Sequence, residues 1–300
     1  MVNVALVKGK ERYEAVTEAL ELIRGDIKLP DRPVLIKPNL VSTTKDKELA
    51  VTHRDSVIAT MDFFKGMGVR KFIVADGAGL GVRLDGALDA FGYRDLQRRY
   101  DIEFRDLNFD EPVALTLFDS EFRPKRFEIA RTVVDCYRVS VARMKTHDTV
   151  VVTLAVKNTV IGSLVGAANK PTVHQGYPAM NLSMARIAST IPNDLSIIDG
   201  IVGMEGDGPV GGTAIRPGVV VASADPVACD MIGCELMGFD PDDVGYLYYL
   251  RQMQGLSREQ IRVLGEKVES CSMKFRPHSR YRDQLGWRVP NWRDLLAVPV

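Results

Sequence analysis

The sequence predicts an α/β protein with a mixed, largely parallel sheet flanked by helices. Apolar runs typical of strands alternate with amphipathic helical patterns in the first third of the chain, and the alternation returns in the last third. Several apolar runs end on charged or amide residues, as strands do where they lead into a site. No linker rich in Gly, Ser or Pro interrupts the 300 residues. We therefore predict a single α/β domain over residues 1–300. The alternative is two lobes, with 1–100 and 190–270 in one and an inserted region 101–190.

The first third supplies three strands and two helices. The apolar run "RPVLIKPNL" ends on Lys37 and Asn39, and "KFIVADGAG" ends on Asp76 and three small residues. Amphipathic patterns fill the intervals between the apolar runs. The predicted elements are strands Val2–Val7, 32–40 and 71–79 and helices Tyr13–Ile23 and Ser56–Met67.

The middle of the chain is richer in β-branched and aromatic residues. The runs "PVALTLF", "RFEIARTV" and "YRVSVARMK" predict shorter strands. The run "TVVVTLAVKNTVIGSLVG" remains open between strand and helix, because its valines favour a strand and its length favours a helix. A further amphipathic helix is predicted in "AMNLSMARIASTI".

The last third returns to α/β order. The run "DLSIIDGIVGMEGDGPVGG" predicts a strand that leads into a glycine-rich loop, and "GVVVASADPVACDMIGCELMG" predicts strand, turn and helix. Asp225 is the expected N-cap, because a proline at the first helical position follows it. The segment 272–300 contains both tryptophans and is expected to pack as a terminal arm.

The composition excludes several classes of protein. Lys+Arg and Asp+Glu both total 39, so the formal net charge is zero and gives no support for nucleic acid or a membrane as the main partner. No window reaches about 18 uninterrupted apolar residues, so a cytoplasmic protein is expected. The four cysteines form no CxxC run, so the chain has no local iron–sulfur or zinc motif and we expect four buried thiols.

Polar clusters occur where predicted strands end. They are Lys37 with Asn39, Asp76, Lys145 with His147, the stretch from Asp199 to Asp207, and Ser223 with Asp225. Ligands of open α/β sheets bind at the carboxyl ends of the strands. If these strands share one sheet, the clusters converge on one crevice.

The loop "DGIVGMEGDGPVGG" contains six glycines and three acids. Glycine amides, those of Gly206 and Gly208 among them, can approach an anion closely. The carboxylates of Asp199, Glu205 and Asp207 are oxygen ligands of the kind that Mg²⁺ prefers. The alternative is a solvated loop whose acids face water.

Lysines and histidines gather around "VVVTLAVKN". Lys145 and His147 precede this segment, Lys157 is its last residue but one, and His174 follows it. Histidine and a lysine of lowered pKa are the usual acid and base near neutral pH. His147 is the expected proton-transfer residue, with Lys145 or His174 as its counterpart. The alternative is that the lysines pair with aspartates and hold the fold together.

In this order, "VLIKPNLV", "VTHRDSVIATMDFFKGMGVRKFIVADGAG", "ARMKTHDTVVVTLAVKNTVIG", "IIDGIVGMEGDGPVGG" and "VVVASADPVACD" resemble the family called domain of unknown function 362. The resemblance covers roughly residues 1–250. The family's polar positions fall on Lys37, Asn39, Asp76, Lys145, His147, Lys157, Asn158, Asp199, Asp207, Ser223, Asp225 and Asp230.

The resemblance carries further implications. Many members are fused to a ferredoxin-like domain with two four-iron clusters. This sequence contains no cysteine run of that kind, so an electron-transfer role would require a separate ferredoxin-like partner. The family is also distantly similar at fold level to the lactate racemase family, which performs two-base chemistry on a 2-hydroxy acid with a nickel pincer cofactor. Fold similarity does not by itself carry function.

We therefore predict an enzyme, isomerase- or racemase-like or another metal-assisted acid–base enzyme, for a small anionic substrate that carries a carboxylate or phosphate. The alternatives are a ligand-binding or accessory module for an iron–sulfur or redox partner, and motifs that only maintain the fold. A homo-oligomer is a further expectation. The predicted catalytic residues are Lys145, His147, Lys157 and His174; the predicted substrate-binding residues are Lys37, Asn39, Asn158, Gly206, Gly208 and Ser223; and the predicted metal ligands, for a divalent cation such as Mg²⁺, are Asp76, Asp199, Glu205 and Asp207.

Overall fold

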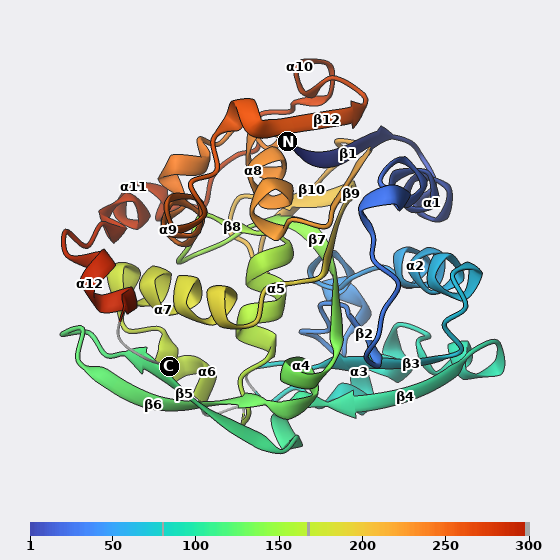
Figure 1. Cartoon of the computed structure of the whole chain (residues 1–300), viewed down its shortest axis with the longest axis horizontal. Helices are drawn as coiled ribbons and strands as arrows, with labels where there is room; N and C mark the ends of the chain where they lie inside the picture. The colour runs from blue at the N-terminus through green and yellow to red at the C-terminus, as the bar shows by residue number, and fades with distance from the viewer. Residues whose placement is uncertain (80, 167–168, 298–300) are drawn as a thin grey trace.

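A mixed ten-stranded sheet runs through the molecule (Figure 1). The computed structural model describes residues 1–79, 81–166 and 169–297, without the side chain of Asn169. The strand order is β12-β1-β11-β9-β7-β2-β3-β4, with β10 paired to β9 and β8 paired to β7. The strands are β1 (Val2–Lys8), β2 (Val34–Lys37), β3 (Lys71–Asp76), β4 (Asp101–Asp106), β7 (Tyr137–Thr146), β8 (Val152–Thr153), β9 (Leu195–Glu205), β10 (Thr213–Ile215), β11 (Val219–Ser223) and β12 (Ile261–Gly265).

Strand direction decides which strand ends meet. β2 is parallel to β3 and β7, β3 to β4, and β7 to β9. β11 is antiparallel to both of its neighbours, β1 and β9. The carboxyl ends of β2, β3, β7 and β9 therefore share one edge of the sheet, and β11 ends at the opposite edge. The predicted fold class, a mixed and largely parallel sheet flanked by helices, is confirmed.

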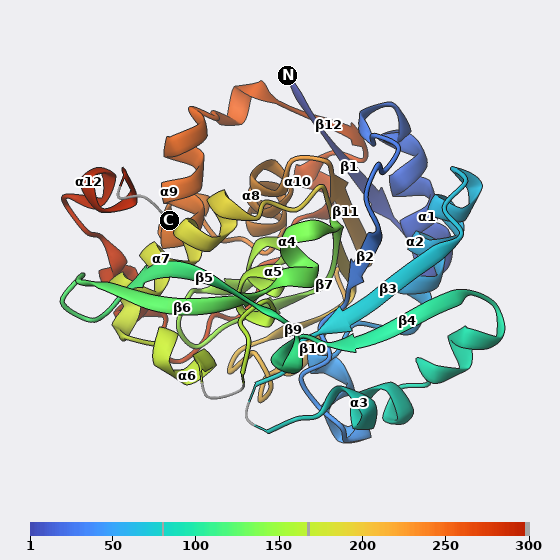
Figure 2. The ribbon, with the colours of Figure 1, turned by 60° about the horizontal axis from the view of Figure 1, so that its bottom comes forward.

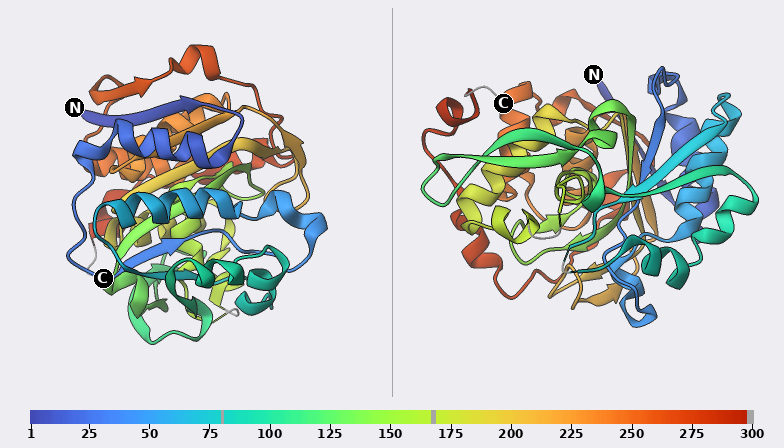
Figure 3. Two further views of the ribbon diagram at one scale, coloured as in Figure 1. Left: turned by 90° about the vertical axis from the view of Figure 1, so that its right-hand side faces the viewer. Right: turned by 90° about the horizontal axis from the view of Figure 1, so that it is seen from below.

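Helices cover both faces of the sheet, as the two views of Figure 3 show. One apolar layer joins the sheet to the first three α-helices, and a second joins its other face to the later helices. Along β2, Val34 and Ile36 enter the first layer and Leu35 the second, which is the period-two alternation of a strand covered on both faces. The first layer contains α1 (Arg12–Leu22), α2 (Arg54–Gly66) and α3 (Leu84–Ala90), and the second contains α5 (Ala155–Gly162), α7 (Gly176–Thr190), α8 (Pro226–Leu236) and α9 (Gly245–Gln254).

A two-stranded ribbon of β5 (Pro112–Phe118) and β6 (Pro124–Ala130) packs on the second layer, where Figure 2 shows it crossing the later helices. The remaining short α-helices are α4 (Arg131–Asp135), α6 (Asn169–Val173), α10 (Val268–Cys271), α11 (Tyr281–Gln284) and α12 (Trp292–Ala297). The 3-10 turns are η1 (Arg24–Asp26), η2 (Lys45–Ala50), η3 (Arg94–Arg98), η4 (Leu107–Phe109), η5 (Pro241–Asp243), η6 (Arg258–Gln260) and η7 (Leu285–Trp287).

The segment left open between strand and helix is both. It forms the short strand β8 and then the helix α5, which begins at Ala155. The buried Asp230 carboxylate accepts the amides of Ala155 at 2.9 Å and Val156 at 3.1 Å. These bonds satisfy two amides of the first helical turn. A residue 75 positions away thus fixes where α5 starts.

Four other predictions concern the start of α8, the cysteines, the glycine-rich loop and the terminal arm. Asp225 caps α8 as expected, by accepting the amides of Val227 and Ala228 at 2.9 Å. The four cysteines are buried and free, as expected. The expected glycine-rich loop begins later than predicted, because β9 continues as a strand to Glu205. The terminal arm packs through Trp287 and Trp292, which are buried, although 298–300 lie outside the described residues.

None of the helices in the described part of the chain is both long and apolar enough to cross a bilayer. The number of domains and the cytoplasmic location stay predictions.

Candidate functional site

A pocket of about 380 Å³ lies at the carboxyl edge of the parallel strands. Segments that follow β2, β3, β7 and β9 contribute to its wall, and α5 and α6 close its side. This is where ligands bind in open α/β sheets. Within the described ranges the lining residues are Asn39, Val41, Asp76, Gly77, Gly79, His147, Asp148, Lys157, Asn158, Ile161, Gly162, Lys170, Pro171, His174 and Pro209.

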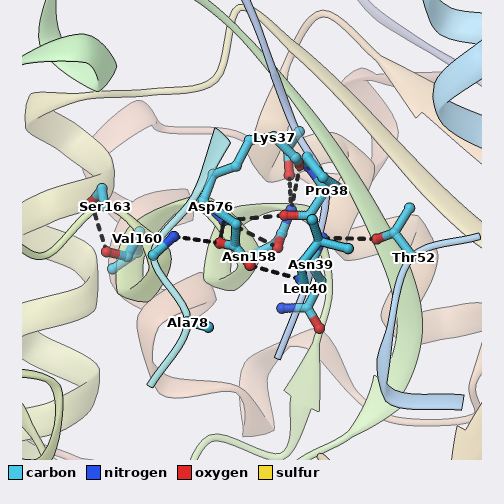
Figure 4. Close-up of polar contacts among 12 residues, drawn as sticks. Lys37, Pro38, Asn39, Leu40, Thr52, Asp76, Ala78, Asn158, Val160 and Ser163 are labelled. Atoms are coloured by element: carbon cyan, nitrogen blue, oxygen red, sulfur yellow. Dashed lines mark hydrogen bonds and ion pairs between the residues drawn. The ribbon is translucent and has the colours of Figure 1, made fainter. Parts of the chain in front are cut away.

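The floor of the pocket is a buried ion pair between Lys37 and Asp76 (Figure 4). The Lys37 ammonium lies 2.5 Å from Asp76 Oδ1, and Asp76 Oδ2 accepts the amide of Leu40 at 2.6 Å. Asn158 Nδ2 donates to the Lys37 carbonyl at 2.9 Å, which ties α5 to the end of β2. A Cβ at Gly162 would collide with the Lys37 ammonium, so only glycine lets α5 approach this closely. Lys37 and Asn158 are therefore committed to the floor.

Lys145 lies behind the wall and does not line the pocket. Its ammonium donates to Asn39 Oδ1 at 2.7 Å and to the Ala50 carbonyl at 2.8 Å. Burial, with the positive charges of Lys157 and Arg143, holds the pKa of Lys145 well below its usual value. Lysine can only donate, so this bond fixes the Asn39 amide with its oxygen toward Lys145. The Asn39 Nδ2 group has no partner within the described residues, and Asn39 lines the pocket.

His147 follows β7 and lies in a tight turn. Its backbone amide donates to the Val151 carbonyl at 2.8 Å, and Val151 has a φ of 66°, which is strained for a β-branched residue. Gln284 of the terminal arm holds this turn. It accepts the Val151 amide at 2.8 Å and donates to the His147 carbonyl at 2.8 Å. The position of His147 thus depends on the far end of the chain.

The two pocket histidines carry their protons on different ring nitrogens. His147 Nδ1 accepts the Thr149 amide at 3.0 Å, so its proton is on Nε2. The Asp148 carboxylate also lies 3.0 Å from this Nδ1, but it is exposed and accepts the Thr149 hydroxyl. His174 Nδ1 lies 2.8 Å from the Lys170 carbonyl and must donate there, which leaves Nε2 as an acceptor. Neither Nε2 has a partner within the ranges that the structure describes.

Both histidines are neutral at pH 7. Burial, followed by the nearby charge of Lys157, holds the pKa of His147 well below its usual value. Burial also lowers the pKa of His174, although its hydrogen bond to the Lys170 carbonyl opposes the shift. The pocket lining therefore contains one histidine with a neutral N–H donor and one with a neutral base.

Lys157 differs from the other lysines of the site. It is half-buried on α5, lines the pocket, and makes neither a hydrogen bond nor an ion pair within the described part of the chain. Burial lowers its pKa to about 8, while Asp148 opposes and Lys37 adds to the shift. Lys170, whose pKa burial also lowers to about 8, donates to Asn108 Oδ1 at 2.5 Å and to the Leu164 carbonyl at 2.8 Å.

The four predicted metal ligands do not converge. Asp76 is in the floor, and Asp199 lies on the α1 and α2 face, where it accepts Arg12 Nε at 2.9 Å and the Ser56 hydroxyl at 2.9 Å. Glu205 and Asp207 accept amides of the terminal arm. Asp199 was predicted at a strand end, and the continuation of β9 to Glu205 places it within the strand instead. The described residues contain no group of three or more His, Cys, Asp or Glu side chains that could hold a metal ion.

The two glycine amides predicted to contact the substrate are bonded to protein carbonyls instead. The Gly206 amide donates to the Arg276 carbonyl at 2.8 Å, and the Gly208 amide to the Gly206 carbonyl at 2.8 Å. Ser223 ends β11 at the opposite edge of the sheet, where it donates to the Asn3 carbonyl at 2.7 Å and accepts the Asp225 amide at 3.0 Å. The structure therefore does not place Gly206, Gly208 and Ser223 as substrate contacts.

The sequence reasoning missed Lys170, Asp148 and Gln284. The spacing of Lys170 and His174, four residues apart in "NKPTVHQ", was an available signal for one helical face. Asp148 directly follows His147, so its position in the pocket could have been expected. Gln284 gave no signal, because it lies 137 positions from the carbonyl that it holds.

Comparisons with known proteins place the chain in a broad group. The family model described as domain of unknown function (DUF362) matches residues 34–235. A thylakoid-associated protein of Synechocystis sp. is 29% identical over 224 residues, which are 72% of this chain and 66% of that relative.

Two solved structures have a distantly similar fold. The lactate racemase apoprotein of Thermoanaerobacterium thermosaccharolyticum matches with a TM-score of 0.46 and 15% identity, over 79% of this chain and 57% of that one. A Thermotoga maritima protein matches with a TM-score of 0.44 and 12% identity, over 66% of this chain and 52% of that one. The chain thus spans about half to two thirds of the length of these proteins.

Proposed function

The chain belongs to the family of domain of unknown function 362, and because that description assigns no reaction, we propose from the chemistry of the pocket that the protein is an enzyme that acts on a small anionic molecule through lysine and histidine acid–base chemistry. One observation carries the proposal. Lys157, His147 and His174 line a single pocket, and Lys157 Nζ and the Nε2 atoms of both histidines have no partner among the described residues. Polar groups gathered at a concave site without protein partners are typical of a binding site.

The charges favour an anion. The charge of Lys37 is balanced by Asp76, and Lys145 lies behind the wall, where it donates to Asn39 and Ala50. Lys157 and Lys170 therefore supply the positive charge of the pocket lining. The Asn39 Nδ2 group offers a neutral donor beside them. A carboxylate or a phosphate matches cations and amide donors of this kind. The volume of about 380 Å³ suits a small metabolite.

The histidines divide the acid–base work. His174 Nε2 is a neutral acceptor and can take a proton from the bound molecule. His147 Nε2–H is a neutral donor and can stabilise negative charge on a substrate oxygen. Of the two counterparts expected for His147 in proton transfer, Lys145 and His174, only His174 lines the pocket, so we assign the pair His147 and His174. Positioned proton transfer contributes about 10²–10⁴-fold to rate.

Two measurements test the proposal. Calorimetry with small carboxylates and with phosphate should find a ligand for the wild-type protein, and Lys157→Met should weaken its binding about tenfold, the loss of roughly 1.4 kcal/mol. Proton exchange at carbon is then followed by NMR in D₂O with the bound carboxylates, with and without Mg²⁺. His174→Gln should slow the exchange at least about a hundredfold, as loss of a general base does.

The exposed substitution Lys71→Arg is the matched control and should change neither binding nor exchange. The proposal is wrong if no anion binds the wild-type protein, or if His174→Gln exchanges protons as fast as the wild type does.

A further inference from the structure

We propose that the Lys157 amine forms a covalent imine with the carbonyl carbon of the bound anion, so that the substrate class is a small carboxylate or phosphate that carries an aldehyde or ketone. This inference rests on the proposed function and names the chemistry of the same pocket. It starts from the contrast between Lys157 and its neighbours: Lys37, Lys145 and Lys170 all donate to named protein oxygens, whereas Lys157 donates to none within the described residues.

A nucleophilic lysine must be accessible and must lose its proton easily. Lys157 is half-buried on the pocket wall, and no residue that the structure describes forms a salt bridge with it that would keep it charged. With a pKa of about 8, Lys157 carries a neutral amine in about a tenth of the molecules at pH 7. For an ordinary lysine the neutral fraction is roughly a few molecules in ten thousand. Desolvation of this kind is the usual way in which lysines become Schiff-base nucleophiles.

The first step is addition. The nitrogen lone pair of neutral Lys157 forms a bond to the carbonyl carbon, and the carbonyl π electrons move to the oxygen. His147 Nε2–H and the Asn39 amide donate hydrogen bonds to that developing oxyanion. The neutral imidazole of His147 stays neutral in this step, because it donates a hydrogen bond and transfers no proton.

The second step is loss of water. His174 Nε2 takes a proton from the nitrogen, which became positive on addition, and returns it to the oxygen, which also takes one from the solvent. The carbon–oxygen bond breaks, water leaves, and the nitrogen lone pair forms the carbon–nitrogen double bond. The net reaction joins one amine, one carbonyl and one proton to give one iminium ion and one water, with no oxidant or reductant.

The iminium ion would make His174 effective as a base. A positive nitrogen accepts the electrons released when a proton leaves the neighbouring carbon, which a carboxylate substrate alone does poorly. The pocket thus contains the groups for three tasks: Lys157 for attachment, His174 for proton transfer, and His147 with Asn39 for the oxygen.

Reductive trapping tests the inference on the whole protein. Wild-type protein is incubated with sodium cyanoborohydride and either pyruvate or glyceraldehyde 3-phosphate, which separates a carboxylate preference from a phosphate preference. The adducts are then mapped by peptide mass spectrometry. We expect one dominant adduct on Lys157, at least tenfold above any other lysine, and a trapping rate that rises with a midpoint near pH 8 rather than near 10.5, the ordinary lysine value.

Two variants separate imine formation from charge. Lys157→Arg keeps the positive charge, so it should retain anion binding and lose the adduct, whereas the exposed Lys71→Arg should trap as the wild type does. Thermal unfolding shows that the variants are folded, and the pH midpoint is measured on the wild type alone.

If the wild-type adducts are spread over exposed lysines, or if no adduct forms although the anion binds, the imine is wrong and the proposed function stands. If neither probe nor any other anion binds, the proposed function fails as well.

Discussion

The floor and the wall of the pocket use the same residue type in opposite ways. In the floor, the Lys37 ammonium is buried against Asp76 and held by Asn158, so every charge has a protein partner. In the wall, Lys157 lies one position away from Asn158 and has no partner within the described ranges. The neighbouring residues of one helix therefore serve two purposes. Asn158 stabilises the junction of α5 with β2, and Lys157 is left for a ligand.

Whether a lysine has a protein partner distinguishes residues that look alike in the sequence. Lys37, Lys145 and Lys157 were all predicted as site residues from the sequence, yet their surroundings predict different effects of substitution. Removal of a paired buried charge exposes its partner and destabilises the fold. Removal of an unpaired buried charge relieves a cost, as is common at functional sites. The following predictions test that contrast, in order of decreasing effect.

The largest effect is expected at the floor. Lys37→Met leaves the Asp76 carboxylate buried without its cation, so the free energy of unfolding should fall by about 3–5 kcal/mol, as is typical for one broken member of a buried pair. Urea unfolding measures it. The double variant Lys37→Met with Asp76→Asn removes both charges and should recover at least half of the loss. If the double variant recovers no stability, the Lys37 ammonium stabilises the fold through contacts other than its ion pair with Asp76.

The next effect has the opposite sign. Lys157→Met should raise the free energy of unfolding at pH 7 by about 1–3 kcal/mol, since it removes a charge whose burial is not compensated. The folded pKa of Lys157, about 8, lies below the ordinary 10.5. The native state therefore binds fewer protons than the unfolded state between these two values. The cost is fully present below pH 8 and is lost as the pH rises to 10.5.

The stability advantage of Lys157→Met should therefore shrink across that window, which urea unfolding at several pH values can follow. Lys170→Met is the matched control. It has a similar pKa, but its loss leaves Asn108 Oδ1 and the Leu164 carbonyl without a donor, so no stabilisation is expected. A loss of stability in Lys157→Met would show that this lysine has a structural partner.

A smaller effect should connect the terminal arm to the pocket. Gln284→Ala removes both hydrogen bonds that Gln284 makes to the His147 turn, and the free energy of unfolding should fall by about 2 kcal/mol. The affinity for anions should fall as well. Without Gln284 the strained conformation of Val151 is no longer held, so the turn no longer keeps His147 in place. The exposed Gln254→Ala should change stability by less than about 0.5 kcal/mol. If Gln284→Ala binds the anion as tightly as the wild type, the terminal arm does not affect the site.

The sequence predicted the fold well, because the patterns that define it are local. The buried runs around Leu35 and Val74 became strands of one sheet, and Asp225 with Pro226 marked the start of α8. The start of α5 could not be predicted. It depends on the Asp230 carboxylate, which only the folded chain brings to the amides of Ala155 and Val156.

The site was predicted in part. Residues at or just after the ends of parallel strands, such as Asn39, Asp76 and His147, do share a pocket. The reasoning failed where it assumed that every strand exit points the same way. Strand direction is set by pairing between distant segments, and a sequence pattern does not carry it. The predicted convergence of the glycine-loop acids on the site is not seen, for a related reason. Glu205 and Asp207 accept amides of the terminal arm, which lies far along the chain.

The smallest effect is expected at Ser223, which tests this argument about strand direction. Because β11 is antiparallel, Ser223 lies at the sheet edge opposite the pocket, and Ser223→Ala should leave anion binding unchanged. The lost bond to the Asn3 carbonyl should cost about 0.5–1.5 kcal/mol of stability. Asn39→Ala makes the opposite comparison. It follows the parallel strand β2 and should weaken anion binding about tenfold, roughly 1.4 kcal/mol. Calorimetry on both variants shows at which edge of the sheet the anion binds. A tenfold loss of affinity in Ser223→Ala, with none in Asn39→Ala, would place the ligand at the edge opposite the pocket and contradict every role assigned to Lys157.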